Sequence, residues 1–230
     1  MNDTTSRRRL LLGVSGLAFG LAGCSGGGTE AEPTPTPTAT STPTASDERL
    51  PSPVLGDPDA AVTLAVYEDF ACPHCADYNE NGFDTLHAEY IEPEAIRYEH
   101  RDAPIPVADP GSWQAASAAR AVQARHGTDA FWNYAEKLFA HASELGGDVE
   151  ALFERLASEL GYDDAAEIAT AGVERVHDPT VQADRQRAGE IGVPGTPAFV
   201  VDGEVVTSGF GSDTISTVQS ALEGALSESA

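Results

Sequence analysis

Two cysteines follow an apolar run and precede a helical pattern, in the segment Cys72-Pro73-His74-Cys75. The run 62–67 is β-branched and aromatic, which predicts a buried strand, and apolar residues at helical intervals predict a helix over 77–90. Cys72 should therefore lie at a helix N-terminus, where unpaired N–H groups and the helix dipole favour the thiolate over the thiol. Cys75, one turn further on, is placed to close a reversible disulfide with Cys72. We expect an accessible Cys72 and a shielded Cys75.

A C-x-x-C pair also occurs in structural zinc sites and in inert disulfides, and both alternatives stay open. A closed zinc site needs four ligands, usually two such pairs or one pair plus two spaced histidines. The third cysteine, Cys24, belongs to a different segment. The six histidines are scattered without an H-x-x-x-H pair: His74, His87, His100, His126, His141 and His177. We therefore expect no metal site.

The charge balance is strongly acidic. The 230 residues include 13 Lys plus Arg against 37 Asp plus Glu, a net charge of −24, and Lys137 is the single lysine. Such a surface repels nucleic acid. At molar salt the screening length falls to about 3 Å, so the self-repulsion largely disappears. The composition resembles that of secreted proteins of extreme halophiles, with an acidic protein adapted to ordinary salt as the alternative.

The N-terminus has the pattern of an export signal. Ser6-Arg7-Arg8-Arg9 precedes an apolar stretch over 10–22, which is shorter than the roughly 20 residues that span a bilayer. The arginines resemble a twin-arginine signal, and Leu21-Ala22-Gly23-Cys24 resembles a lipobox whose cysteine is lipidated. We predict a signal peptide over 1–23 and anchoring of Cys24 on the extracytoplasmic face of the cell membrane, with a free or disulfide-bonded Cys24 as the alternative.

The residues after Cys24 divide into a tether and a globular domain. The segment 24–50 is rich in Thr and Pro, which favours an extended linker. Cleavage after residue 23 leaves 10 Lys plus Arg against 36 Asp plus Glu, a net charge of −26. The remaining residues, 51–230, are enough for one domain with a core.

Within 51–230 the pattern runs strand, helix, strand, helical block, hairpin, helix. A second strand is expected over 96–101 and helices from 110 to 191, with a capping box from Asp164 to Glu167 and an N-cap at Asp178. Asp202-Gly203 predicts a two-residue hairpin, and 215–226 a closing helix. This order predicts an α/β thioredoxin fold, a central mixed β-sheet flanked by helices, with a helical insertion at about 109–191.

The two motifs resemble those of one enzyme family. Cys72-Pro73-His74-Cys75 looks like the C-P-H-C of DsbA-type disulfide oxidoreductases, and the segment Gly192 to Phe199 is similar to their cis-proline loop. The resemblance covers about 54–227. It implies that Thr196-Pro197 is cis and faces Cys72, that the Thr196 backbone aligns the substrate, and that His74 helps to stabilise the Cys72 thiolate.

The chain departs from thioredoxin-like proteins at one position. In those proteins an acidic residue six positions before the first cysteine relays protons to the second, but here that position is Val66. Glu68, two residues on, lies on the same face of the predicted strand. Glu68 is therefore a candidate substitute for the missing proton relay, with a solvent-facing Glu68 as the alternative.

These residues predict an extracytoplasmic thiol-disulfide oxidoreductase that donates the Cys72–Cys75 disulfide to exported proteins. Its cofactor would be the disulfide alone, and its partners exported thiols and a membrane protein that regenerates the disulfide. A membrane-tethered reductase or isomerase is the alternative enzyme. A metal-binding or scaffold lipoprotein is the alternative without enzyme activity.

Overall fold

The computed structural model describes residues 49–229, and the account below concerns these residues. The predicted signal peptide over 1–23, the lipidation site Cys24 and nearly all of the predicted linker lie outside them. Within the described part, no helix combines the length and the apolar character needed to cross a membrane.

The centre of the domain is a five-stranded mixed sheet in the order β1-β3-β2-β4-β5. The strands are β1 (Val54–Gly56), β2 (Thr63–Glu68), β3 (Arg97–Asp102), β4 (Ala198–Val201) and β5 (Glu204–Ser208). β2 pairs with β3 in parallel, and the other neighbouring strands are antiparallel. The β4–β5 hairpin turns at Asp202 and Gly203, both with positive φ, as the sequence predicts.

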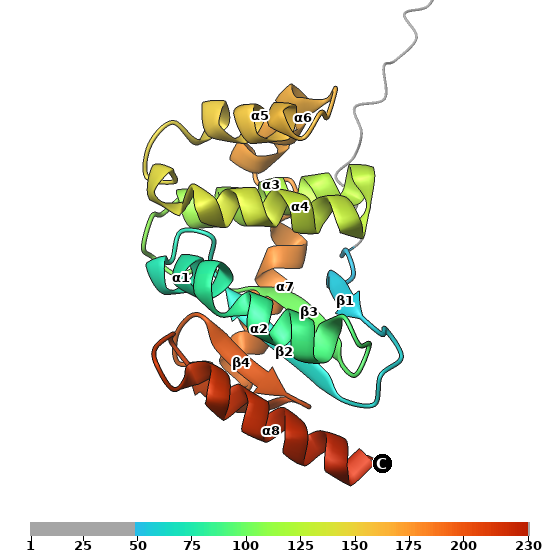
Figure 1. The fold of residues 1–230 in the computed structure, drawn as a ribbon. Coiled ribbons are helices and arrows are strands. Elements are labelled where there is room, and N and C mark those ends of the chain that lie inside the picture. Colours follow the sequence, from blue (N-terminus) through green and yellow to red (C-terminus); the bar gives the residue numbers. More distant parts are fainter. Residues whose placement is uncertain (1–48, 230) are drawn as a thin grey trace, which may run out of the picture. The chain divides into compact units, whose positions relative to one another are not determined.

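Helices cover both faces of this sheet. On one face lie α1 (Pro73–Asn81), α2 (Phe83–Leu86), a π-helical turn η1 (His87–Ile91) and α8 (Thr214–Ser229), as Figure 1 shows. They pack on the side chains that alternate along β2, beginning with Leu64 and Val66, and Val218 and Leu222 of α8 join this core. On the other face, Ala188 of α7 (Asp178–Glu190) packs with Ala65 and Tyr67.

The segment between β3 and β4 is helical, as predicted from its apolar periodicity. It contains α3 (Gly111–His126), α4 (Thr128–Ala140), a 3-10 turn η2 (Ala142–Glu144), α5 (Val149–Glu159), α6 (Ala165–Val173) and α7. The first four α-helices gather on one side of the sheet, away from α8 (Figure 1). Their small and aromatic residues form a second core that includes both cysteines.

Two expectations about the sheet side of the fold are wrong. The helix expected over 77–90 is interrupted at Gly82, which is the C-cap of α1, and a Cβ at this position would lie 2.7 Å from the Phe210 ring. The order of elements expected for 51–230 begins with the strand 62–67, yet Val54–Gly56 form an earlier edge strand paired with β3. This strand is three residues long, too short for its alternation to be recognised.

The expected caps of two helices also differ. Asp164 precedes α6 but makes no capping hydrogen bond, because its carboxylate instead binds Arg125 and His126 at 2.9 and 2.8 Å. The helix α7 starts at Asp178 itself, and His177 occupies the N-cap position. The difference at α6 arises from neighbours that are remote in sequence. The difference at α7 is a one-residue shift in the helix boundary.

Candidate active site

Cys72 is the N-cap residue of α1, at the junction between β2 and the helix. Its backbone N–H donates to Asp69 O at 3.0 Å, and its carbonyl accepts from Cys75 and Ala76. Pro73 occupies the first helical position, where its missing N–H costs no hydrogen bond. The predicted placement of Cys72 at a helix N-terminus is confirmed.

The two thiols have opposite electrostatic environments. A hydrogen bond from Cys75 is the main cause that lowers the pKa of Cys72 to about 5, against burial, which raises it. The backbone N–H groups of Cys75 and His74 lower it further. Burial raises the pKa of Cys75 well above 9, and the hydrogen bond to Cys72 and the charge of Glu68 add to the rise. At neutral pH the reduced pair is therefore a Cys72 thiolate beside a Cys75 thiol.

Both cysteines are free thiols and both are buried. Cys75 is fully covered, as expected, but Cys72 is only 3% exposed, so the expectation of an accessible Cys72 is wrong. The cause is packing, because Cys72 lies in the same core cluster as Phe70 and the helices of the insertion. The two cysteines therefore differ in the pKa of their thiols rather than in their exposure.

The cis-proline loop faces the redox pair. The Thr196-Pro197 peptide bond is cis, as the family resemblance implied. Cys72 Sγ, as a thiol, donates to the Thr196 carbonyl oxygen at 3.5 Å. Thr196 and Pro197 are both buried where the chain enters β4. The structure thus brings together two motifs that lie more than 120 residues apart.

The two residues between the cysteines contribute differently. Pro73 and His74 are exposed on the first turn of α1. His74 acts on Cys72 through its backbone N–H, which lowers the pKa of Cys72. This donor is present whatever the side chain at position 74, a point that sequence reasoning about the imidazole missed.

Glu68 is buried beside the redox pair. Val66 and Glu68 lie on one face of β2, and Glu68 is 2% exposed, so the solvent-facing alternative is wrong. Asn79 Nδ2 donates to Glu68 Oε1 at 2.7 Å and to the Cys75 carbonyl at 2.9 Å. Glu68 is thereby tied to the helical turn that carries Cys75.

Two further buried acids were not singled out from the sequence. Asp69 accepts hydrogen bonds from the backbone N–H groups of Ala71 and Ile105 at 2.9 Å each. Burial raises the pKa of Asp69 to about 6, against those two hydrogen bonds, and the charge of Cys72 adds to the rise. Asp102 lies at the end of β3, in contact with His100 and Arg120. An acidic residue before a C-x-x-C motif could have pointed to Asp69, but no local signal marks the β3 group.

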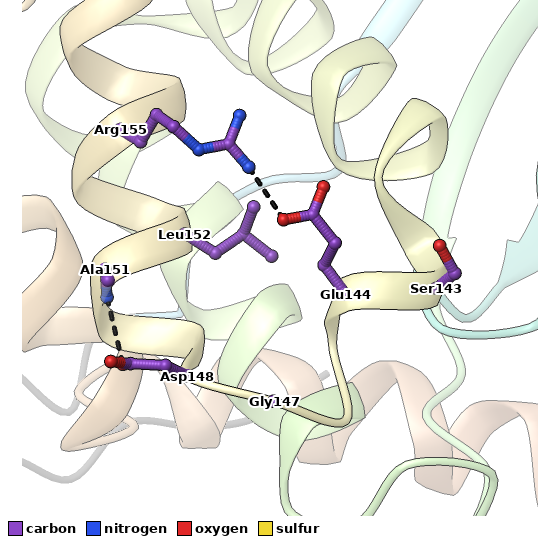
Figure 2. Close-up of a pocket in the computed structure, with 7 residues that line it drawn as sticks. All are labelled: Ser143, Glu144, Gly147, Asp148, Ala151, Leu152 and Arg155. Carbon is purple, nitrogen blue, oxygen red and sulfur yellow. Dashed lines mark hydrogen bonds and ion pairs between the residues drawn. The ribbon is translucent and has the colours of Figure 1, made fainter.

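No other feature of the described residues competes with the redox pair. Among residues 49–229, no group of three or more His, Cys, Asp or Glu is arranged to hold a metal ion. A surface hollow lies between α5 and the turn before it (Figure 2), lined by Ser143, Glu144, Gly147, Asp148, Ala151, Leu152 and Arg155. Its charged groups already have partners within the hollow. Arg155 binds Glu144 at 2.9 Å, and Asp148, the N-cap of α5, accepts a hydrogen bond from the Ala151 backbone N–H.

Comparison with known proteins gives one family and several relatives. A family model described as Thioredoxin matches residues 48–223. The Na(+)/H(+) antiporter NhaA 3 of Salinispora tropica is 34% identical over 160 residues, which is 65% of this chain and 21% of that protein. Disulfide bond formation protein D of Bacillus subtilis is 32% identical over 87 residues, 38% of each chain. The chain therefore spans well under half the length of either relative.

A solved structure gives a wider match. Oxidised BdbD from Bacillus subtilis superposes with a TM-score of 0.68 at 22% identity, covering 76% of this chain and 93% of BdbD. At that identity the likeness establishes the arrangement of the sheet and helices. The mixed α/β fold expected from the sequence is confirmed.

Proposed function

We propose that this chain, which belongs to the thioredoxin family, is a thiol-disulfide oxidoreductase. Its redox centre is the Cys72–Cys75 pair. One observation carries the proposal: Cys72 is the N-cap residue of α1, with Cys75 one turn further on, and its sulfur lies 3.5 Å from the Thr196 carbonyl oxygen in the cis-proline loop. This position lowers the pKa of Cys72, while burial raises that of Cys75. A low-pKa thiolate is a good leaving group, and a buried protonated thiol is its natural resolving partner. The name of the relative Disulfide bond formation protein D supports the same chemistry.

The direction that we propose is oxidation of exported proteins. A substrate thiolate attacks Cys72 Sγ, the Cys72–Cys75 bond breaks, and Cys75 leaves as a thiolate that takes up a proton. A second substrate thiolate then attacks the substrate sulfur of the mixed disulfide, and Cys72 leaves as a thiolate. Two electrons have passed from the substrate to the enzyme, which ends as a dithiol. Stabilisation of the Cys72 thiolate favours this product.

The residues around the pair take distinct roles in this proposal. Thr196 aligns the substrate chain against Cys72, because its backbone carbonyl lies at the sulfur. Pro197 carries no N–H, so no donor competes there. Pro73 and the His74 backbone shape the first turn of α1. Glu68 relays the proton to and from Cys75, which is supported by its burial and its link through Asn79.

We place the enzyme on the extracytoplasmic face of the cell membrane, anchored through a lipidated Cys24. The twin-arginine pattern and the lipobox support this location, and the Thr/Pro linker would hold the domain away from the anchor. A membrane partner would then reoxidise the dithiol. Cys24→Ser should remove the lipid from residue 24, which mass spectrometry of the wild-type and variant proteins would show. A wild-type protein without lipid at Cys24, or unchanged membrane retention of a Cys24→Ser protein that has lost its signal peptide, would argue against the anchor.

The equilibrium with a glutathione buffer tests the direction. The pKa of Cys72, about 5, lies between about 7 for thioredoxin and about 3.5 for DsbA. We therefore expect a reduction potential between the about −270 mV of thioredoxin and the about −120 mV of DsbA. A value at or below that of thioredoxin would favour the reductase alternative. If Cys72 and Cys75 do not exchange with glutathione at all, the result would favour the alternative without enzyme activity, a metal-binding or scaffold lipoprotein.

A further inference from the structure

His100 lies on β3 between two buried carboxylates. Its Nδ1 is 3.3 Å from Glu68 Oε2, and its Nε2 is 3.2 Å from Asp102 Oδ1. The parallel register of β2 and β3 produces this arrangement, since it sets Glu68 opposite Asp102 with His100 two residues before it. The side chains of all three are at most 1% exposed. Glu68, whose charge raises the pKa of Cys75, is thus in contact with a buried imidazole.

Asp102 determines which ring nitrogen of His100 is free. Arg120 Nε donates to Asp102 Oδ2 at 2.6 Å, so Asp102 is a carboxylate whose other oxygen accepts from His100 Nε2. A neutral ring then carries its hydrogen on Nε2 and leaves Nδ1 bare. This Nδ1 lies 3.3 Å from Glu68 Oε2, where it can donate a hydrogen bond only after the ring has taken up a proton. A bare Nδ1 beside a carboxylate is a proton acceptor.

Aromatic side chains enclose this imidazole. Phe70 stacks on it at 5.4 Å between ring centroids, with Phe131 at 5.2 Å and Trp132 at 6.2 Å. These three side chains carry no charge, and Cys75 on the other side of Glu68 is fully buried. Bulk water therefore has little access to the proton that Cys75 must lose or gain.

The remaining charged groups near His100 are compensated elsewhere. Arg120 also binds Asp184 at 3.0 Å, so it is held between two carboxylates. Within the described residues, the other partner of Glu68 is the neutral amide of Asn79. Asp69, the next acid along the chain, accepts from the backbone N–H groups of Ala71 and Ile105. Glu68 is thus the carboxylate that contacts His100 and whose charge acts on Cys75.

We propose that His100 is the base behind Glu68, which takes the proton that Cys75 loses when its thiol attacks the mixed disulfide on Cys72. This inference rests on the proposed thiol-disulfide exchange. The Cys75 proton passes to the Glu68 carboxylate, which becomes a carboxylic acid and then gives that proton to His100 Nδ1. The Cys72–Cys75 bond forms, the bond from Cys72 to the substrate sulfur breaks, and the substrate leaves as a thiolate.

The reverse step uses the same groups. When a substrate thiolate attacks the Cys72–Cys75 disulfide, Cys75 leaves as a thiolate and is protonated from the His100 imidazolium through Glu68. His100 does not touch a sulfur atom, so it is a positioning and proton-storing residue that acts through Glu68. Its protonation state therefore sets the pH dependence of the step in which Cys75 reacts.

The pH at which His100 works follows from its surroundings. Burial alone would lower the pKa of His100, but the hydrogen bonds and charges of Asp102 and Glu68 outweigh it and raise the pKa above 6.5. Below that pKa the imidazolium cannot accept a proton from Cys75. The rate of Cys75 attack should hence rise tenfold per pH unit below the pKa and level off above it.

A single-turnover measurement isolates this step. The full-length reduced protein is mixed with a chromogenic aromatic disulfide in molar salt, which forms a mixed disulfide at Cys72, and release of the second aromatic thiol by Cys75 is followed by stopped flow. We expect an inflection above pH 6.5. His100→Gln should remove the inflection and slow the release at pH 7 by about 10²-fold, as for loss of a general base. The control is His126, a surface histidine paired with Asp164. His126→Gln should keep the wild-type inflection and the wild-type rate of release.

The outcomes separate this inference from the proposed function. An inflection that survives in His100→Gln, or a wild-type rate with no inflection, overturns the role of His100 while exchange itself stands. Absence of any mixed disulfide would overturn the proposed function instead. If His100→Gln does not fold, an NMR titration of the His100 ring in the wild-type protein decides. Its pKa must match the kinetic inflection, and a mismatch refutes the proposal.

Discussion

Cys72 Sγ lies 3.5 Å from the carbonyl oxygen of Thr196, a residue 124 positions further along the chain. The sulfur that is expected to exchange is therefore enclosed where α1 meets the loop before β4. A substrate that reaches Cys72 must also meet Thr196, which is how one short loop can both cover the thiolate and align the incoming chain.

The first prediction concerns the roles of the two cysteines. Cys75→Ser should trap mixed disulfides through Cys72, because no second thiol remains to resolve them. In the reduced wild-type protein, alkylation near pH 7 should label Cys72 first, since its pKa is about 5 while that of Cys75 lies well above 9. Peptide mapping after a short pulse of iodoacetamide gives the order. Labelling of Cys75 first would reverse the assignment.

The second prediction concerns His74. Its backbone N–H survives substitution, and an ionic contact made by an exposed side chain contributes about 0.2–1 kcal/mol. One pKa unit corresponds to about 1.4 kcal/mol, so His74→Ala should raise the pKa of Cys72 by less than about one unit. The reduction potential should become slightly more negative in step. Ultraviolet thiolate absorbance against pH measures the shift, and a much larger one would mean that the imidazole itself holds the thiolate.

The third prediction concerns salt. A mature chain with a net charge of −26 should repel itself at low ionic strength and be screened near molar salt. Stepwise dilution from molar salt, followed by circular dichroism, should show loss of the helical signal. A fully folded signal in dilute buffer would contradict the halophile interpretation and favour an acidic protein adapted to ordinary salt.

The fourth prediction concerns Asp69, whose pKa is raised from 3.8 to about 6 mainly by burial. A raised carboxyl pKa means that the protonated form stabilises the fold below about pH 4, and that this contribution is lost as pH rises through 6. About two pKa units correspond to about 3 kcal/mol of unfolding free energy. Urea titrations at pH 4 and 7 should show this loss in the wild-type protein and a smaller one in Asp69→Asn. Equal losses would show that Asp69 is not the group responsible.

The sequence identifies the redox pair, the cis-proline loop and the order of elements because each has a local signature. The spacing of Cys72 and Cys75, the segment ending in Thr196-Pro197 and the Asp202-Gly203 hairpin can all be recognised without knowing what lies opposite them. The three-residue strand β1 has no such signature, since its pairing with β3 defines it.

The buried ionic groups could not be predicted because they depend on register between strands and on distant helices. Glu68 meets His100 only through the β2–β3 pairing, and Asp102 meets Arg120 from α3. Each of these residues alone reads as an ordinary polar position on a strand or helix. The covering of Cys72 likewise results from the packing of the helical insertion.

The last prediction concerns Arg120, which is fully buried between two carboxylates. It binds Asp102 at 2.6 Å and Asp184 at 3.0 Å. Arg120→Met leaves those carboxylates in the core without their cation, and breaking such a buried pair typically costs about 3–5 kcal/mol. Urea unfolding at pH 7 in molar salt should show a loss of this size. Arg125→Gln, which removes an exposed pair with Asp164, should cost less than about 1 kcal/mol.

The loss in Arg120→Met should also depend on pH in a definite direction. Burial would raise the pKa of Asp102, but the charge of Arg120 and the hydrogen bond from His100 outweigh it and hold the pKa below 3.8. A lowered carboxyl pKa stabilises the fold above the unfolded pKa, and this contribution is lost as pH falls through the folded pKa. Without Arg120, burial raises the pKa of Asp102, so the difference between wild type and variant should shrink steadily as pH falls from 7 towards 3. A difference that stays constant from pH 7 to pH 3 would mean that Arg120 stabilises the core by packing rather than through its charge.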